Sequence, residues 1–212
     1  MAYFPFLIEI EGKLCVIVGG GIVANRKAEI ILRFGAKVKV IAPDICNSMK
    51  LLDNTEKDLT ICQKSFQISD LDGADFVIAA TDDEGINSYI SQLCHERDIL
   101  VNVVDVKEEC SFIFPAVIKK DDLLVSISSG GNSPAVTSIL KEKIEESIPD
   151  YYSKVVKMLG SFRSEIKEKV SDAKERRKLY YELIEYAAEQ GTELSVDCIK
   201  SMIVKYERNN QS

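Results

Sequence analysis

The first part of the chain alternates short apolar runs with segments of helical periodicity. Leu14-Cys15-Val16-Ile17-Val18 is a continuous apolar run that stops at three glycines, which is typical of a strand buried on both faces. From Val23 to Leu32 the apolar positions recur at helical spacing, and Gly35 supplies a stop. The pattern predicts a strand, a glycine turn and a helix in succession.

The alternation continues to about residue 113. Further strands are predicted at 38–41, 59–62, 75–80 and 100–104, and a second helix at 84–97, with the 59–62 strand only weakly patterned. Strands and helices that alternate at this spacing favour an α/β fold with a doubly wound parallel sheet. We therefore predict that residues 1–113 form a Rossmann-type domain.

Beyond residue 111 the pattern changes. Two apolar runs, 112–118 and 123–127, are separated by Lys119-Lys120-Asp121-Asp122, which suits the turn of an antiparallel hairpin outside the first sheet. From Ser133-Pro134, a favourable helix start, the chain is helical in pattern apart from breaks near Pro149 and Gly191. We predict a small hairpin region over 114–148 and a helical carboxyl-terminal domain over 149–212.

Charge is distributed unevenly along the chain. Of the formal net charge of −7, all lies in residues 1–113, which carry 11 basic and 18 acidic side chains, whereas the remainder carries 16 of each. No general affinity for nucleic acid or an anionic membrane is expected. An acidic ligand would meet the least repulsion beside the second half.

Cysteine and histidine usage gives no metal motif. The six cysteines are scattered without a C-x-x-C pair, and the single histidine, His95, lies late in a predicted helix where a surface or core role is favoured. The apolar opening lacks a basic region and runs into Glu9 and Glu11, so it is not typical of a signal peptide. No apolar run is long enough to span a bilayer. We expect a cytoplasmic protein with reduced thiols and no bound metal.

The strongest motif is the glycine turn after the first strand. Gly19-Gly20-Gly21-Ile22-Val23-Ala24 matches G-x-G-x-x-G/A between an apolar strand and an amphipathic helix. Gly19 permits the tight turn, Gly21 lets a pyrophosphate approach the backbone, and Ala24 lets helix and strand pack closely. The helix amides and dipole then favour phosphate, which predicts dinucleotide binding. A degenerate domain that binds nothing is the alternative.

An acidic residue is expected near the end of the second strand to bind ribose hydroxyls. Asp44 lies 20 residues past Ala24, after Pro43, and either binds the ribose or caps the next helix. No arginine lies between Gly35 and Asp44 to receive a 2′-phosphate, which favours NAD over NADP.

Two further sites follow predicted strands at the edge where ligands bind in open α/β sheets. Thr81 could contact the nicotinamide, while Asp82 or Asp83 could cap the following helix. Asp105 directly follows the strand 100–104, where a carboxylate can accept a proton or coordinate a metal. The alternative for Asp105 is an ordinary loop carboxylate in solvent.

A second glycine-rich turn opens the later helical part. Ser128-Ser129-Gly130-Gly131-Asn132-Ser133-Pro134 offers backbone amides and hydroxyls to an anion, with Ser129, Gly130 and Gly131 as candidate substrate contacts. A purely structural turn explains the same pattern equally well.

Taken together, these motifs resemble the precorrin-2 dehydrogenase family, the amino-terminal module of siroheme synthases. Five blocks match in order over about residues 1–150, namely 18–24 with Arg26-Lys27-Ala28, 80–83, 102–105, 111–116 and 128–134. Five blocks in sequence are specific where one alone would mean little. The helical remainder matches only in general character.

This resemblance implies oxidation of precorrin-2 to sirohydrochlorin with NAD⁺ as hydride acceptor, on the path to siroheme. It implies Asp105 as the catalytic carboxylate, Ser129 in the tetrapyrrole site, and a homodimer whose hairpin and following helix exchange between subunits. Implied cofactor contacts are Ile22, Val23, Pro43 and Asp44. The chain has no room for the methyltransferase domain of multifunctional siroheme synthases, so a stand-alone form is expected.

Three rival functions remain at this point. Some family members also insert ferrous iron into sirohydrochlorin, so a bifunctional dehydrogenase–ferrochelatase is an alternative. A Rossmann module that senses NAD(H) and regulates a partner would bind cofactor without turnover. A short-chain dehydrogenase is disfavoured because no Tyr-x-x-x-Lys pair follows the fifth strand.

Overall fold

The computed structural model describes residues 4–209, so Met1 to Tyr3 of the apolar opening lie outside the described residues. The chain divides into two compact units, one ending at Phe114 and one beginning at Pro115. The expected three-part division, with a further boundary after residue 148, remains a prediction.

The first unit is built on five parallel strands in the order β3-β2-β1-β4-β5. The strands are β1 (Leu14–Val18), β2 (Lys37–Ala42), β3 (Leu59–Gln63), β4 (Phe76–Ala79) and β5 (Leu100–Val103). All four residues of β4 are buried, as are the last four of β1, which explains their continuous apolar sequence. The predicted doubly wound parallel sheet is confirmed.

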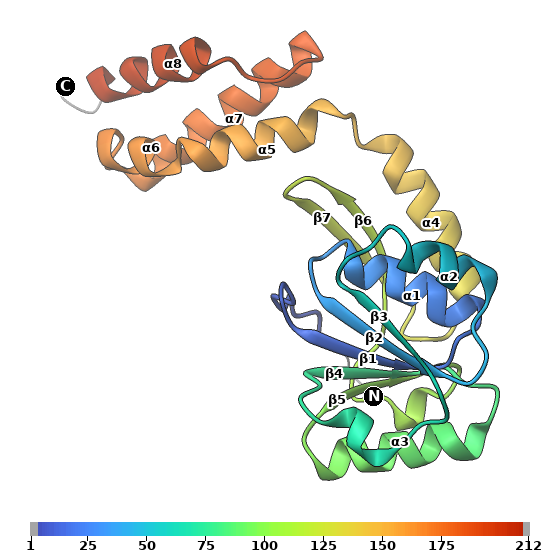
Figure 1. Ribbon diagram of the computed structural model, residues 1–212. Helices are drawn as coiled ribbons and strands as arrows, with labels where there is room; N and C mark the ends of the chain where they lie inside the picture. The colour runs from blue at the N-terminus through green and yellow to red at the C-terminus, as the bar shows by residue number, and fades with distance from the viewer. Residues whose placement is uncertain (1–3, 210–212) are drawn as a thin grey trace. The chain divides into compact units, whose positions relative to one another are not determined.

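Helices cover both faces of this sheet (Figure 1). On one face lie α1 (Ile22–Leu32) and α2 (Asn47–Asp53), and on the other lies α3 (Glu84–Glu96). Ile17 of β1 packs in the core cluster that contains Ala28 of α1, whereas its neighbour Val16 packs in the cluster that contains Ile90 of α3. Successive strand residues alternate between the clusters because their side chains point to opposite faces.

The sequence pattern gave no bounds for α2 and did not predict the 3₁₀ helices of the first unit. Only Met49 of α2 is buried, and the helix is too short to show a clear helical period. The 3₁₀ helix η1 (Ile68–Leu71) carries the buried Asp70, whose carboxylate accepts from Lys39 at 3.2 Å and from Lys64 at 2.8 Å. These ion pairs join η1 to the edge of the sheet at β2 and β3.

The order of the strands creates a switch point beside β1. The chain proceeds from β1 outward to β2 and β3, then crosses to β4 and β5 on the opposite side of β1. In open α/β sheets a ligand binds in the crevice at the carboxyl ends of the two strands that flank this reversal, here β1 and β4.

The second unit begins with an antiparallel hairpin of β6 (Ala116–Lys120) and β7 (Leu123–Ile127). The expectation of a strand over 112–118 is wrong at its start, because Phe112 and Phe114 pack against the core of the first unit. Lys119 and Lys120 were expected in the turn but belong to β6. The turn is shorter, since Asp121 adopts a φ of +50° and the register pairs Lys120 with Leu123.

The rest of the second unit is helical, as predicted. The helices are α4 (Pro134–Ser147), α5 (Tyr151–Ser161), α6 (Arg163–Lys169), α7 (Ala173–Gln190) and α8 (Val196–Asn209). A core cluster that includes Val155, Ile166, Leu183 and Ile199 joins α5 to α8, whereas α4 has no buried residue. Within residues 4–209, no helix combines the length and apolar character that crossing a bilayer requires.

Candidate functional site

The glycine turn begins at the carboxyl end of β1. Gly19 has a φ of +128°, and a Cβ on it would lie 2.1 Å from the carbonyl oxygen of Ala80, which follows β4. Both the backbone conformation and the close approach of the two strand ends therefore require glycine. This position fulfils the tight-turn role expected of Gly19.

Gly20 is also required, which the motif does not indicate because it treats this position as variable. A Cβ on Gly20 would lie 2.1 Å from the carbonyl oxygen of Asp44, and the Gly20 carbonyl accepts from the Cys46 amide at 2.9 Å. The turn after β1 is thus packed tightly against the segment after β2. The need for glycine at position 20 is evident only from this tertiary contact with a residue 24 positions later.

Gly21 differs from both neighbours because a Cβ on it would meet no protein atom within 4 Å. It is the N-cap of α1 and no side chain caps that helix, so the amides of Ile22, Val23 and Ala24 lack a side-chain acceptor. Ala24 is fully buried against the sheet, whereas Ile22 and Val23 are exposed. Open space in front of uncapped helix amides fits a pyrophosphate group.

Pro43 and Asp44 follow β2 at the same edge of the sheet. The Pro43 carbonyl accepts from Gln63 Nε2 at 2.9 Å, which fixes the segment to the end of β3. Asp44 is exposed, and Cys46 rather than Asp44 is the N-cap of α2. The capping role is therefore excluded, and ribose binding by Asp44 stays a prediction.

Thr81 lies in the turn after β4, and its hydroxyl is already engaged. Its Oγ1 donates to Oδ1 of Asn87 at 2.8 Å, and Nδ2 of Asn87 donates to the Thr81 carbonyl at 2.9 Å. Asp83 caps α3, since its Oδ1 accepts from the Ile86 amide at 3.0 Å. The buried Asn87, which sequence reasoning missed, holds the turn, while the contact of Thr81 with nicotinamide remains a prediction.

Asp105 lies two residues beyond β5 at the carboxyl edge. It is exposed and has a φ of +64°, a conformation that aspartate tolerates better than most residues. The Sγ of Cys110, just after the 3₁₀ helix η2 (Lys107–Glu109), lies 3.1 Å from the Val103 amide and 3.3 Å from the Val106 carbonyl. Cys110 thus closes the loop that presents the Asp105 carboxylate.

A lysine lies beneath this loop. Lys27 of α1 points at the sheet, where its Nζ donates to Oδ1 of Asn102 at 3.0 Å and lies 4.1 Å from the centroid of the Phe114 ring. Burial lowers the pKa of Lys27 to about 8, while the charges of Cys110, Asp105 and Cys15 act in the opposite direction. The sequence offered Lys27 only as part of the Arg26-Lys27-Ala28 block.

The serine–glycine turn lies in the second unit. Gly130 and Gly131 have φ values of +63° and +84°. Ser128 Oγ accepts from the Gly130 amide at 3.0 Å and Ser129 Oγ accepts from the Ser133 amide at 2.9 Å, so hydroxyls already occupy two of the amides. The Ser129 hydroxyl proton and the Gly131 amide have no acceptor within the described residues, and both can serve an anion.

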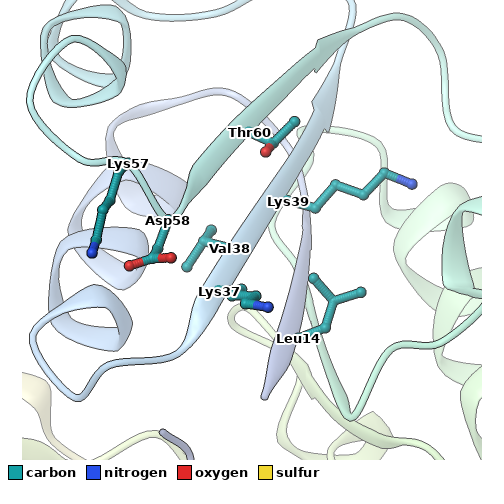
Figure 2. Close-up of a pocket in the computed structure, with 7 residues that line it drawn as sticks. All are labelled: Leu14, Lys37, Val38, Lys39, Lys57, Asp58 and Thr60. Atoms are coloured by element: carbon teal, nitrogen blue, oxygen red, sulfur yellow. The ribbon is translucent and has the colours of Figure 1, made fainter. Parts of the chain in front are cut away.

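A surface hollow and His95 both lie away from the carboxyl edge of the parallel sheet. A hollow of about 300 Å³ lies at the amino ends of β1 and β2, lined by Lys37, Lys57 and Asp58 among others (Figure 2). The glycine turn lies at the opposite ends of the same strands. His95 is exposed in the last turn of α3, with Nδ1 2.8 Å from the Ser91 carbonyl.

Family models match both units. Residues 6–116 match the family described as "Putative NAD(P)-binding", and residues 121–147 match "Sirohaem biosynthesis protein central". The first match covers more than half of the chain and includes the glycine turn, Asp44, Thr81 and Asp105.

Individual proteins agree with these matches. A siroheme synthase of Buchnera aphidicola is 38% identical over 205 residues, which cover 94% of this chain and 43% of that protein. A siroheme synthase of Photorhabdus laumondii is 39% identical over 85% of this chain and 38% of its own length. The chain therefore spans about two fifths of these relatives. Among solved structures, "SirC, precorrin-2 dehydrogenase" has a TM-score of 0.77 at 23% identity and covers 97% of this chain and 100% of that chain, which shows the shared fold.

Proposed function

This chain belongs to the NAD(P)-binding family matched by residues 6–116, and from that premise we propose that it is an NAD-dependent dehydrogenase that oxidises precorrin-2 to sirohydrochlorin. In this reaction the substrate loses a hydride to NAD⁺ and a proton to the enzyme, which yields sirohydrochlorin and NADH. The observation that carries the proposal is the open helix terminus at Gly21, which has the space and the free amides for a dinucleotide pyrophosphate.

The cofactor would be held at the carboxyl edge of the first unit. The amides of Ile22, Val23 and Ala24 would donate to its phosphates, and the exposed carboxylate of Asp44 would accept from ribose hydroxyls. A 2′-phosphate would face the Asp44 charge, which favours NAD over NADP. When bound, the nicotinamide supplies the hydride acceptor, and the protein supplies orientation and proton transfer.

Asp105 would accept the proton. The carboxylate is exposed at the carboxyl edge, where it would lie within reach of a substrate that docks against the nicotinamide, and its loop is fixed by Cys110. Asp105→Asn keeps the size and the tolerance of a positive φ but removes the proton acceptor. We expect a fall in kcat on the order of 100-fold with NAD⁺ affinity unchanged.

Asp98→Asn is the matched control, because Asp98 is also exposed and has a φ of +55°, but lies before β5 rather than after it. An unchanged rate in Asp105→Asn, or an equal loss in Asp98→Asn, would remove Asp105 from the reaction.

The substrate carries many carboxylates, and the Ser129 hydroxyl with the Gly131 amide would bind one of them, whereas the Gly130 amide already donates to Ser128 Oγ. Of these groups, the Ser129 proton and the Gly131 amide are free of intramolecular acceptors in the described part of the chain. The near-neutral charge of residues 114–212 opposes such a ligand less than the acidic first part does.

We also propose that the chain forms a homodimer through α4. Helix α4 has no buried residue, and Val136, Ile139 and Leu140 expose 51%, 53% and 43% of their surface. Three neighbouring apolar side chains on one helix need a cover that a second copy would supply. Light scattering of Ile139→Asp should show a lower mass than the unchanged chain, and equal masses would contradict this interface.

The decisive experiment incubates the purified chain with precorrin-2 and NAD⁺ and follows NADH and sirohydrochlorin together. Formation of both supports the dehydrogenase. NAD⁺ binding without turnover would favour a sensing module, and metal insertion into sirohydrochlorin without NAD⁺ would reveal a chelatase as well. The six cysteines are free thiols, which suits the reducing cytoplasm that we propose as the compartment.

A further inference from the structure

We infer that Gln63 is a positioning residue for cofactor choice, whose side-chain amide holds the Pro43–Asp44 peptide so that the Asp44 carboxylate faces the adenosine ribose and disfavours a 2′-phosphate. This inference rests on the proposed function, since Asp44 has this role only if the first unit binds NAD⁺ at the glycine turn. Gln63 is the last residue of β3, and neither the glycine motif nor the acidic position after β2 includes it.

Gln63 reaches the peptide unit that directly precedes Asp44. Its Nε2 donates to the Pro43 carbonyl at 2.9 Å, and that carbonyl belongs to the peptide that joins Pro43 to Asp44. Because a peptide unit is planar and moves as one body, a hydrogen bond to its oxygen restricts the whole unit up to the Asp44 Cα. The donor therefore acts, across 20 positions of the chain, on the residue that would bind the ribose.

The side chain does what the main chain of β3 no longer does at this point. In the register of the sheet Gln63 lies beside Ala42, which is the last residue of β2. The amide of the next residue, Lys64, donates to the Cys62 carbonyl at 2.9 Å, so the chain turns back where a longer strand would have continued the ladder. The Gln63 side chain thus extends the pairing of β2 and β3 by one peptide, to Pro43.

The chain on the other side of Asp44 is fixed by the glycine turn. A Cβ on Gly20 would lie 2.1 Å from the Asp44 carbonyl oxygen, and the Cys46 amide donates to the Gly20 carbonyl at 2.9 Å. Ile45 is 8% exposed and packs in the core of the sheet. These contacts act after the Asp44 Cα, whereas the Gln63 bond acts before it. Together they set the direction in which the Asp44 side chain leaves the backbone.

The direction of this exposed carboxylate bears on the choice between two dinucleotides. Held in one direction, it accepts from the ribose hydroxyls of NAD⁺ and repels the 2′-phosphate of NADP⁺. If the peptide before it moves, the carboxylate can turn into solvent, which weakens those hydrogen bonds and relieves the repulsion. Gln63 therefore contributes to discrimination at the ribose, whereas the pyrophosphate is bound by the amides after Gly21.

Gln63→Met removes the donor but keeps the length of the side chain, at an exposed position where the change should leave folding intact. Calorimetry on the full chain should show the Kd for NAD⁺ raised about fivefold and the Kd for NADP⁺ changed by less than about twofold. The preference for NAD⁺ should therefore fall. A general loosening of the site would raise both Kd values by the same factor, and that result, like two unchanged values, overturns the inference.

A double-mutant cycle with Asp44→Ala tests whether Gln63 acts through Asp44. Asp44→Ala alone should weaken NAD⁺ binding about tenfold and abolish the preference over NADP⁺. In that background Gln63→Met should change neither Kd by more than about twofold, because the carboxylate that it positions is gone. A further loss as large as in the unchanged chain would mean that Gln63 contacts NAD⁺ itself or supports the site in another way, and it overturns the inference.

Gln92→Met is the matched control, because Gln92 is also exposed and its Nε2 donates to Glu96 Oε1 at 2.8 Å, in the second half of α3. It should keep both Kd values, and a shift equal to that of Gln63→Met would overturn the inference. Turnover is followed separately. A chain that makes no NADH from precorrin-2 yet shows the altered preference contradicts the proposed function alone. NADH formation with an unaltered preference contradicts this inference alone, and a chain that binds neither dinucleotide contradicts both.

Discussion

The chain contains two glycine-rich turns that each precede a helix, and they differ in whether side chains accept hydrogen bonds from their backbone amides. The turn before α1 leaves the amides after Gly21 without any side-chain cap, and open space lies in front of them. In the turn before α4, the hydroxyl oxygens of Ser128, Ser129 and Ser133 accept hydrogen bonds from the backbone amides of the turn and of the first helical residues. Glycine-rich sequence before a helix is therefore not sufficient to define an anion site.

This difference suits two different ligands. Bare helix amides bind a phosphate through several donors and the helix dipole. A turn whose amides are mostly satisfied offers a serine hydroxyl and a remaining amide, which match a single carboxylate of an organic substrate. The first turn also depends on close packing of backbone at Gly19 and Gly20.

The largest effect is expected from Gly19→Ala. The added Cβ would lie 2.1 Å from the Ala80 carbonyl oxygen at a φ of +128°, so the two strand ends must separate. We expect the free energy of unfolding to fall by about 3 kcal/mol or more, together with loss of NAD⁺ binding. Urea denaturation measures the first quantity. A variant as stable as the unchanged chain would contradict the packing described for this turn.

Gly21→Ala should separate binding from stability. A Cβ at this position meets no protein atom and the φ of −83° is ordinary, so the free energy of unfolding should change by only a few tenths of a kcal/mol. The methyl group would occupy the pyrophosphate space, and NAD⁺ affinity should fall on the order of 100-fold. Calorimetry with NAD⁺ tests this prediction, and an unaltered affinity would show that NAD⁺ does not bind next to Gly21.

The buried amine of Lys27 should make the free energy of unfolding of the chain depend on pH. The pKa of Lys27 falls from the ordinary 10.5 to about 8 on folding, so between these values the unfolded chain binds more protons and stability rises with pH. Relative to Lys27→Met, the unchanged chain should gain roughly 2–3 kcal/mol between pH 7 and 10. Denaturation of both chains at several pH values measures the difference, and parallel curves would show that Lys27 titrates normally.

The smallest effect is expected in the second turn. Ser129→Ala removes the acceptor of the Ser133 amide and the free hydroxyl proton, which should cost about 1 kcal/mol of stability and raise the KM for precorrin-2 about tenfold. Ser128→Ala removes a comparable turn contact to Gly130, but not the proposed substrate donor. Equal KM values in the two variants would make Ser129 purely structural.

Local sequence determined much of this protein. Continuous apolar runs predicted β1 and β4, because a strand buried on both faces needs no polar side chain, whereas the edge strand β3 was only weakly patterned. Ser133 caps α4 and Ser195 caps α8, since a hydroxyl there accepts from an amide within three residues. The glycine turn, Asp44 and Asp105 likewise follow strand ends that the pattern locates, and parallel strands bring those ends to one edge.

Tertiary structure alone decided the contacts between distant segments. The requirement for Gly20 comes from the Asp44 carbonyl, the Thr81 hydroxyl is turned toward Asn87, and Lys27 meets Asn102 across 75 positions. Helix α2 is too short to show a clear helical period, and it forms because Met49 and Leu52 dock on a core assembled from elsewhere in the chain. Sequence patterns report which residues must be buried, but a specific partner exists only when folding brings two segments within a few ångströms.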